Sequence, residues 1–234
     1  LLEPLGIEQL VLVPFNKTLA SKSAETFVDE ILVKTLQAKH IAVGENFRFG
    51  RNREGDISTL RKIGASLGIK ISIIPILKDN HGRLSSSRIR KALNEGDLKY
   101  AKNLLNRPYT FRGTVEKGRG LGKTIGWPTA NLKINGRKFL PSLGVYAAWA
   151  SIANNKERFS AVMNLGPQPT IDPNSLSAVE VHLLNKEINL LGHELIIEPV
   201  QRIRPQKKFE SIEALSKQIS LDAKLAKEIL TNSL

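Results

Sequence analysis

Residues 118–132 read GRGLGKTIGWPTANL, a stretch in which closely spaced glycines lead into the run PTAN. The first glycines fall within five positions, at Gly118, Gly120 and Gly122. Glycine lets backbone N–H groups turn inward and approach an anion closely, which is how a loop binds phosphate. Arg119 and Lys123 add positive charge to the same loop. The stretch therefore predicts a phosphate-binding loop, and a glycine- and lysine-rich surface hairpin is the alternative.

The run PTAN carries two oxygen-bearing side chains, Thr129 and Asn131, two positions apart. On an extended segment, residues two apart face the same way. Hydroxyl and amide oxygens are suitable ligands for a hard cation such as Mg²⁺. Together with the glycine loop, this pair predicts a site for a nucleotide phosphate and its magnesium ion.

A P-loop is the first competing motif, because Gly122-Lys123-Thr124 matches the end of G-x-x-x-x-G-K-[ST]. The motif requires glycine at position 117, where the chain has Lys117. A P-loop must also open a helix, and the residues that follow are predicted to prevent one: Gly126, Trp127 and Pro128. The sequence therefore argues against a P-loop.

The composition excludes other kinds of site. The chain has 234 residues, no cysteine and a net charge of +13. It can form neither a disulfide nor a thiolate zinc site, and its four histidines show no metal-ligand spacing. No apolar run approaches the roughly 18–20 residues that span a bilayer, and no signal-peptide pattern opens the chain. We therefore expect a cytoplasmic protein that contacts no membrane.

The positive charge raises nucleic-acid binding as a rival function. The basic residues are spread along the chain, however, and the sparse aromatic residues lack the spacing of a base-stacking motif. An anionic small-molecule substrate explains the charge equally well, so we expect small-molecule partners and no nucleic acid.

The chain begins at Leu1, and its only methionine is Met163. Because translation begins at methionine, we expect that this chain has been processed or is a fragment of a longer protein.

Two patterns divide the chain into expected domains, 1–106 and 107–234. In the first, an apolar run at 10–13 suggests a strand buried on both faces. Ser23 is expected to cap a helix with one apolar stripe, formed by Phe27, Ile31, Leu32 and Leu36. A strand at 40–43, a helix at 56–67 and a strand at 69–74 follow. This order predicts a doubly wound α/β domain with a parallel sheet.

The second domain changes to short alternating segments separated by Gly, Pro and Asn clusters. We expect strands at 110–115, 144–152, 159–163, 178–183 and 195–203. Such spacing is typical of an antiparallel barrel or sandwich. Two helices are expected to close the chain, at 211–219 and 221–230.

Several motifs in this domain, taken in order, resemble the riboflavin kinase family. The glycine-rich turn and PTAN resemble its ATP-binding signature, and Asn164-Leu165-Gly166 with Pro169-Thr170 resembles its N-[IL]-G-x-x-P-T turn. The run 179–182 resembles the strand that carries the family's catalytic glutamate. Further matches in the C-terminal helix region are Arg204, Lys208-Phe209, Leu215, Ile219 and Asp222. The resemblance implies a six-stranded antiparallel barrel with a C-terminal helical cap.

The resemblance also implies the chemistry, which is Mg²⁺-dependent phosphorylation of riboflavin by ATP to give FMN. Glu180 takes the position of the catalytic base, and it faces away from its valine neighbours on the strand. His182 shares its face and is a weaker candidate for flavin contact. The glycine loop and Lys123 would hold the ATP phosphates. Thr129 would bind Mg²⁺, with Asn131 either as a second ligand or as an orienting hydrogen-bond donor. Three positions depart from the family pattern and bear on flavin affinity and loop packing: Gln168, Asn185 and Leu191.

The first domain resembles the adenylyltransferase module of bacterial bifunctional FAD synthetases. The turn 44–50, with Asn46 and Phe47, matches G-x-[DN]-F-x-F-G on the flavin side. The family's phosphate-binding I-S-S-T-x-x-R motif falls on Ser85, Ser86, Ser87 and Arg90. Ordinary helix capping is the alternative for the serines.

That family also has a catalytic H-x-G-H pair, and no two histidines here are so spaced. We therefore expect a truncated adenylyltransferase domain that makes no FAD. A flavin-binding protein of the same fold that has lost catalysis is the remaining alternative to the kinase.

Overall fold

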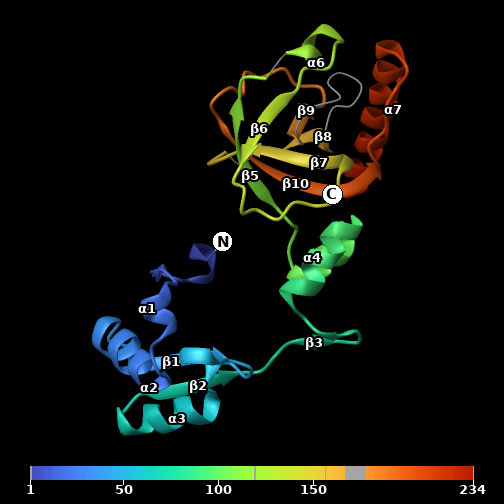
Figure 1. The fold of residues 1–234 in the computed structure, drawn as a ribbon. Helices are drawn as coiled ribbons and strands as arrows, with labels where there is room; N and C mark the ends of the chain where they lie inside the picture. Colours follow the sequence, from blue (N-terminus) through green and yellow to red (C-terminus); the bar gives the residue numbers. More distant parts are fainter. Residues whose placement is uncertain (1, 119, 156, 167–177, 234) are drawn as a thin grey trace. The chain divides into compact units, whose positions relative to one another are not determined.

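The computed structural model describes residues 2–118, 120–155, 157–166 and 178–233 (Figure 1). Its chain forms two compact units, Leu1–Leu84 and Ser85–Leu234. The helices α4 (Ser86–Glu95) and α5 (Leu98–Leu105) belong to the second unit, where Leu93 and Ala101 lie in the core of the following domain. The domain boundary between residues 106 and 107 stays a prediction.

The first unit is an α/β unit built around two parallel strands, β1 (His40–Gly44) and β2 (Lys70–Ile74), paired from His40 opposite Lys70 to Gly44 opposite Ile74. Between them runs α3 (Ile57–Ser66), which begins where Asp56 Oδ1 accepts the Thr59 N–H at 2.9 Å. The expected strands at 40–43 and 69–74 and the helix at 56–67 are therefore present. Shorter elements complete the unit: η1 (Glu3–Leu5), α1 (Lys17–Ala20), η3 (Arg51–Arg53), β3 (Lys78–Asp79) and β4 (Gly82–Arg83).

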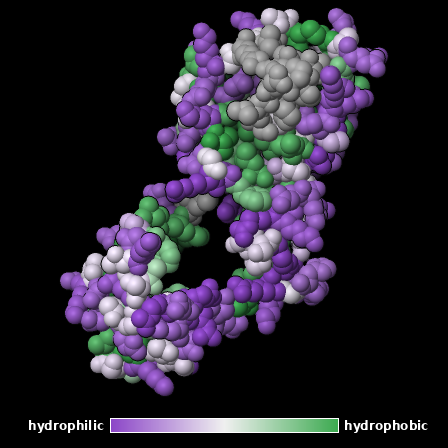
Figure 2. Space-filling view, in the orientation of Figure 1, coloured by the Kyte–Doolittle hydropathy of each residue, from purple (hydrophilic) through white to green (hydrophobic). Residues whose placement is uncertain are grey.

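The expected strand at 10–13 is wrong. These residues lie in no strand, and Leu10 and Leu12 are 67% and 82% exposed. Figure 2 shows hydrophobic surface where the N-terminal segment of Figure 1 lies. The physical reason is that a buried strand needs a neighbour with which to pair. Within the described residues, β1 and β2 pair only with each other.

The helix expected after Ser23 is present, but its winding differs. Ser23 Oγ accepts the Thr26 N–H at 3.1 Å and begins α2 (Ala24–Thr26), which continues as a π-helix, η2 (Phe27–Thr35). At its end the Leu36 N–H donates to Ile31 O, five residues earlier, at 3.0 Å. The wider turn moves the buried stripe away from the 3.6-residue pattern. Val28 is fully buried, whereas Leu36 is 40% exposed.

The second unit contains a closed six-stranded antiparallel barrel with the order β10-β5-β6-β9-β8-β7 (Figure 1). Its strands are β5 (Phe111–Glu116), β6 (Ala130–Ile134), β7 (Gly144–Ile152), β8 (Phe159–Gly166), β9 (Ala178–Leu183) and β10 (Glu194–Arg204). Five of them lie where alternating residues predict strands. The sixth, β6, begins two residues after Pro128 and was not among the expected strands.

Alternation along the strands sorts side chains between the two faces of the barrel wall. Tyr146 and Met163 are fully buried in the interior, with the alternate residues of the other strands. Val145 and Val162 point outward into a second apolar layer, beneath α7 (Ile212–Thr231). In Figure 1, α7 runs alongside the barrel at β7 and β8. This outer layer leaves one part of the wall for polar side chains.

The two C-terminal helices expected at 211–219 and 221–230 are one continuous helix, α7. Ser211 Oγ accepts the Ala214 N–H at 3.1 Å and begins it. Ser220 does not start a second helix, because its hydroxyl donates to the Ser216 carbonyl one turn earlier at 3.2 Å. No helix in the described part of the chain is both long and apolar enough to span a bilayer.

Candidate functional site

Three polar residues lie in a row across neighbouring strands on the outer face of the barrel. In the register of β6 and β9, Asn131 is directly opposite Glu180. In the register of β8 and β9, Asn164 is opposite Glu180 on its other side. Residues directly opposite in an antiparallel pair have Cβ atoms roughly 4.5–5.5 Å apart. The register therefore brings together Asn131 and Glu180, which lie far apart in the sequence.

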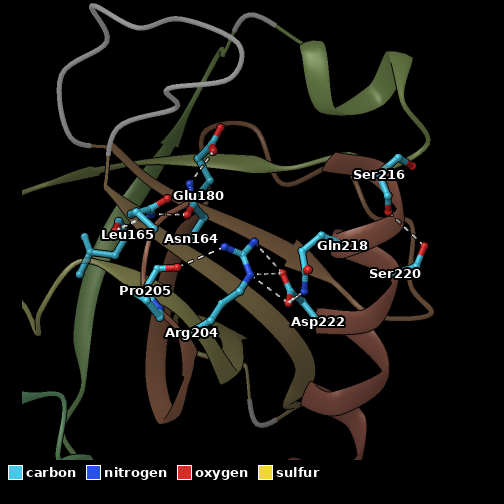
Figure 3. A network of polar contacts seen from close by, with 10 residues as sticks. Asn164, Leu165, Glu180, Arg204, Pro205, Ser216, Gln218, Ser220 and Asp222 are labelled. Carbon is cyan, nitrogen blue, oxygen red and sulfur yellow. Dashed lines mark hydrogen bonds and ion pairs between the residues drawn. The ribbon is translucent and has the colours of Figure 1, made fainter. Parts of the chain in front are cut away.

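Glu180 is buried, with 9% of its surface exposed, although its valine neighbours face the barrel interior. Its Oε2 accepts from Asn164 Nδ2 at 3.4 Å (Figure 3). A strand glutamate between valines is ordinarily solvent-facing, so its burial on the outer face is notable. A buried carboxylate requires polar partners, and the amide of Asn164 is one.

Two glycines of the loop lie directly against the PTAN side chains. A Cβ atom at Gly118 would lie 2.1 Å from Asn131 Nδ2. One at Gly122 would lie 2.3 Å from Trp127 O and 3.2 Å from Thr129 Oγ1. A side chain at Gly122 would have to displace the Trp127 backbone, and one at Gly118 would have to displace the Asn131 side chain. The structure therefore places the glycine loop beside the proposed magnesium ligands, as a phosphate-binding role requires.

A short helix follows the loop, where the sequence predicts none. α6 (Leu121–Thr124) is a single turn of four residues that begins after Gly120. It stops where Gly126, at φ +79°, turns the chain toward Pro128. The prediction that no helix forms here is therefore wrong for this single turn. The chain does not continue into the longer helix that a P-loop requires, as the sequence predicted. Lys123 is exposed on this turn, and Arg119 lies outside the described residues.

His182 holds the PTAN segment in place. Its Nδ1 lies 2.7 Å from Pro128 O, and its ring meets the Trp127 ring edge-on with centroids 5.0 Å apart. Trp127 packs in turn against the apolar layer beneath α7. The contact gives His182 a structural role beside the site, and its expected contact with a flavin stays a prediction.

A network of polar contacts extends from Glu180 toward α7 (Figure 3). Gln206 Nε2 donates to Asn164 Oδ1 at 2.7 Å. Near it, Arg204 forms a two-pronged ion pair with Asp222 of α7, with Nη2 2.8 Å from Oδ2. Asp222 is 2% exposed and also accepts from Gln218 Nε2 at 2.9 Å. The sequence motifs contain Asn164, Arg204 and Asp222, but nothing in them signals the contact with Gln206.

The departures from the family pattern fall at the edge of this region. Asn185 has a left-handed φ of 60°, which asparagine tolerates, and its Oδ1 accepts from Lys227 Nζ of α7 at 2.8 Å. Leu191 is 57% exposed. Gln168 lies outside the described residues. Asn185 therefore links a hairpin to α7.

The residues proposed for an adenylyltransferase site fall in both units. Asn46 and Phe47 line a surface hollow of ≈ 380 Å³ in the first unit, together with Arg48, Arg53 and Asp56. Hydrogen bonds from the Thr59 N–H and from the hydroxyls of Ser58 and Thr59 lower the pKa of Asp56 to about 2. Its carboxylate is therefore negative at neutral pH and partly offsets the charge of the arginines.

The serine motif lies at the start of α4 in the second unit. Ser85 Oγ accepts the Arg88 N–H at 3.4 Å and caps the helix. Ser86, Ser87 and Arg90 are exposed. Capping accounts for Ser85, and a phosphate-binding role for this motif stays a prediction.

The donors available to a metal ion are neutral oxygens. Among the residues that the structure describes, no group of three or more His, Cys, Asp or Glu side chains could hold a metal. Thr129 and Asn131 present a hydroxyl and an amide beside the glycine loop. Mg²⁺ in nucleotide sites is usually held by one or two carboxylates and by phosphate oxygens, and it keeps several waters. Here the hydroxyl and the amide would take the place of the carboxylates, so the phosphates would supply the negative charge.

Comparison with known proteins agrees with this architecture. The family model for riboflavin kinase matches residues 105–230, and the model for FAD synthetase matches residues 1–88. The barrel and its flanking helix thus correspond to a class of enzyme, the riboflavin kinases.

Curated relatives match both units together. Bifunctional riboflavin kinase/FMN adenylyltransferase from Escherichia coli K12 is 35% identical over 223 residues, which cover 95% of this chain and 70% of the relative. The enzyme of that name from Haemophilus influenzae is 35% identical over 97% of this chain and 72% of its own. This chain therefore belongs to the bifunctional riboflavin kinase/FMN adenylyltransferase family.

A solved structure from Streptococcus pneumoniae, described as a macrolide-efflux protein, has the same fold. It superposes with a TM-score of 0.82 at 30% identity, over 97% of this chain and 72% of that one.

Proposed function

We propose that the barrel unit transfers the γ-phosphoryl group of ATP to the ribityl 5′-hydroxyl of riboflavin, giving FMN and ADP. The observation that carries this proposal is the register that sets Glu180 opposite Asn131, with Gly118 against the same asparagine. This observation supports the proposal because the residues proposed as the base, the metal ligands and the phosphate loop then lie within one patch of the barrel wall.

In this mechanism Glu180 accepts the proton of the 5′-hydroxyl as the hydroxyl oxygen forms its bond to the γ-phosphorus. The bond between that phosphorus and the β–γ bridging oxygen breaks, and ADP leaves with the electron pair. Catalysis of phosphoryl transfer consists mostly of positioning and electrostatic stabilisation. The low exposure of Glu180 supports this role, because exclusion of water strengthens each polar contact in the site.

Thr129 and Asn131 would hold Mg²⁺, which when bound neutralises charge on the phosphate oxygens. The backbone N–H groups of the glycine loop and the exposed Lys123 would bind the phosphates. His182 of β9 contacts the Pro128 carbonyl and so holds the PTAN segment against this strand. Thr129 and Asn131 would thereby stay beside Glu180.

The experiment is to incubate the chain with riboflavin, ATP and Mg²⁺ and to separate the flavin products by chromatography. We expect FMN that depends on both ATP and Mg²⁺. We expect no FAD, because the sequence has no H-x-G-H pair. Failure to form FMN while the chain is folded and binds riboflavin would favour a flavin-binding protein without catalysis. Formation of FAD by this chain alone would contradict the expectation for its first domain.

A further inference from the structure

Gln206 is linked to the proposed base through the side chain of Asn164. It follows the end of β10 by two residues and is half-buried. Its side-chain Nε2 donates two hydrogen bonds, to Asn164 Oδ1 at 2.7 Å and to Leu165 O at 3.0 Å. One amide group of Gln206 thus holds both the side chain and the backbone of the segment that ends β8.

The bond to Asn164 decides which end of the asparagine amide faces Glu180. An asparagine side chain has an acceptor oxygen at one end and a donor NH₂ group at the other. Because Gln206 donates to Oδ1, Nδ2 is turned toward Glu180 and donates to Oε2 at 3.4 Å. In the reversed orientation, an amide oxygen would face the carboxylate oxygen, and the two would repel each other.

The segment that carries Gln206 is held at its start, and Gly166 lies against the Gln206 side chain. Arg204 pairs with the buried Asp222 of α7, and its Nη1 donates to Pro205 O at 3.2 Å. On the other side Gly166 leaves room for the amide, because a Cβ at that position would lie 2.9 Å from Gln206 Nε2. A side chain held in this way loses little further entropy when it orients Asn164.

We propose that Gln206 is a positioning residue for phosphoryl transfer. It acts through Asn164, whose amide N–H then holds the Glu180 carboxylate in a single orientation toward the substrate hydroxyl. The proposal rests on the proposed kinase function. Residues that orient a reacting group through a hydrogen bond often affect activity strongly without contacting substrate.

A purely structural role makes a different prediction. If Gln206 only supports the C-terminal end of β8 through the Leu165 carbonyl, replacing Gln206 would lower the free energy of unfolding. The orientation of the Asn164 amide would then stay unchanged. The two roles can therefore be separated by a double-mutant cycle between Gln206 and Asn164.

The test compares Gln206→Met, Asn164→Ala and the double variant, since methionine keeps the length of glutamine but has no amide. We expect Gln206→Met to lower kcat about tenfold while KM for ATP and for riboflavin changes by less than about twofold. In the Asn164→Ala background, the same substitution should change kcat by less than about twofold. Effects that add in the double variant would overturn the proposal. Gln206→Leu is the second variant should methionine impair folding.

Gln218→Met is the matched control. Gln218 also donates from Nε2 within the network, but to Asp222 rather than to Asn164. We expect its kcat to stay within about twofold of the unsubstituted chain. A loss equal to that of Gln206→Met would mean that any weakening of the network slows the reaction, which contradicts a specific role for Gln206.

A second measurement does not depend on turnover. In NMR spectra of the folded chain, the side-chain NH₂ group of Asn164 should give two separate proton signals, assigned by their loss in Asn164→Ala. We expect Gln206→Met to shift these signals and to speed their exchange with water. Unchanged signals would overturn the proposal even in a chain without activity. Absence of FMN formation by the unsubstituted chain would instead overturn the kinase function, so the two failures are distinguishable.

Discussion

The two units of this chain differ in how their strands are paired. In the barrel, closure gives each of the six strands two neighbours. In the α/β unit, β1 and β2 each have one neighbour among the described residues, and the apolar run at 10–13 stays exposed. An unpaired strand edge leaves backbone groups and apolar side chains without partners. The polar row of Asn131, Glu180 and Asn164 lies on barrel strands that are paired on both sides, so its register is fixed.

The largest expected effect concerns the ion pair that fastens α7 to the barrel. Asp222→Ala leaves the largely buried Arg204 guanidinium, 17% exposed, without its carboxylate. We expect a loss of about 3–5 kcal/mol in the free energy of unfolding. Both tryptophans, Trp127 and Trp149, lie in this unit, so their fluorescence in a urea titration measures its stability.

Glu198→Ala is the control for that measurement. Glu198 pairs with Arg158 at 3.0 Å near the surface, with side chains 23% and 48% exposed. An exposed pair of this kind contributes about 0–1 kcal/mol. Equal losses in the two variants would show that α7 is not held mainly by Arg204 and Asp222.

The next effect is on catalysis. Glu180→Gln keeps the shape of the side chain but removes the proton acceptor, so we expect kcat to fall by about two orders of magnitude or more. ATP affinity and the unfolding transition should remain near those of the unsubstituted chain, because the glycine loop is untouched. Steady-state kinetics and nucleotide titration measure both quantities. Near-normal turnover would remove Glu180 from the mechanism.

A smaller effect is expected at the metal ligands. Thr129→Ala removes a hydroxyl that lies beside Gly122, and we expect Mg²⁺-dependent ATP affinity to weaken about tenfold. Thr129→Ser is the matched control, since it keeps the hydroxyl. Titration of each variant with Mg²⁺ at fixed ATP makes the measurement, and an unchanged titration of Thr129→Ala would place the metal elsewhere.

A pH-dependent effect is expected in the α/β unit. Hydrogen bonds from Thr59 and Ser58 hold the pKa of Asp56 at about 2, below its value in an unfolded chain. A carboxyl whose pKa is lowered on folding stabilises the protein above the unfolded pKa, near ~3.9, and loses that contribution as pH falls toward 2.

Asp56→Asn checks this effect, because asparagine also caps a helix but does not titrate. The difference in stability between the two chains should be constant at neutral pH and shrink between about pH 4 and pH 2. NMR shifts of α3 as a function of denaturant measure it. A difference that does not change with pH would show that the cap is insensitive to the charge.

The smallest effect is expected in the exposed apolar run. Leu12 is 82% exposed, so Leu12→Ser should change the stability of the α/β unit by no more than about 0.5 kcal/mol. Leu60, which is fully buried in the same unit, serves as the reference, and Leu60→Ala should cost about 2–5 kcal/mol. A large loss for Leu12→Ser in a denaturant titration would mean that residues 10–13 are buried in solution.

Local patterns were sufficient for many elements. Alternation predicted β7 at 144–152 and β9 at 178–183 with the bounds that the structure has. Asp56 at the start of α3 is a capping signal that needs no knowledge of the fold. Local patterns failed where the result depends on distant residues. An apolar run at 10–13 resembles a buried strand, but its burial requires a partner strand.

The family, the strand-rich second unit and the residue types of the proposed site were predictable from the order of residues, because the glycine spacing, the PTAN run and the valines around Glu180 are local features of the chain. The tertiary structure was needed to show that Asn131 and Glu180 face each other, that Glu180 is buried and that Gln206 donates a hydrogen bond to Asn164. The physical reason is that register and burial depend on the closure of the barrel, which joins strands far apart in the chain.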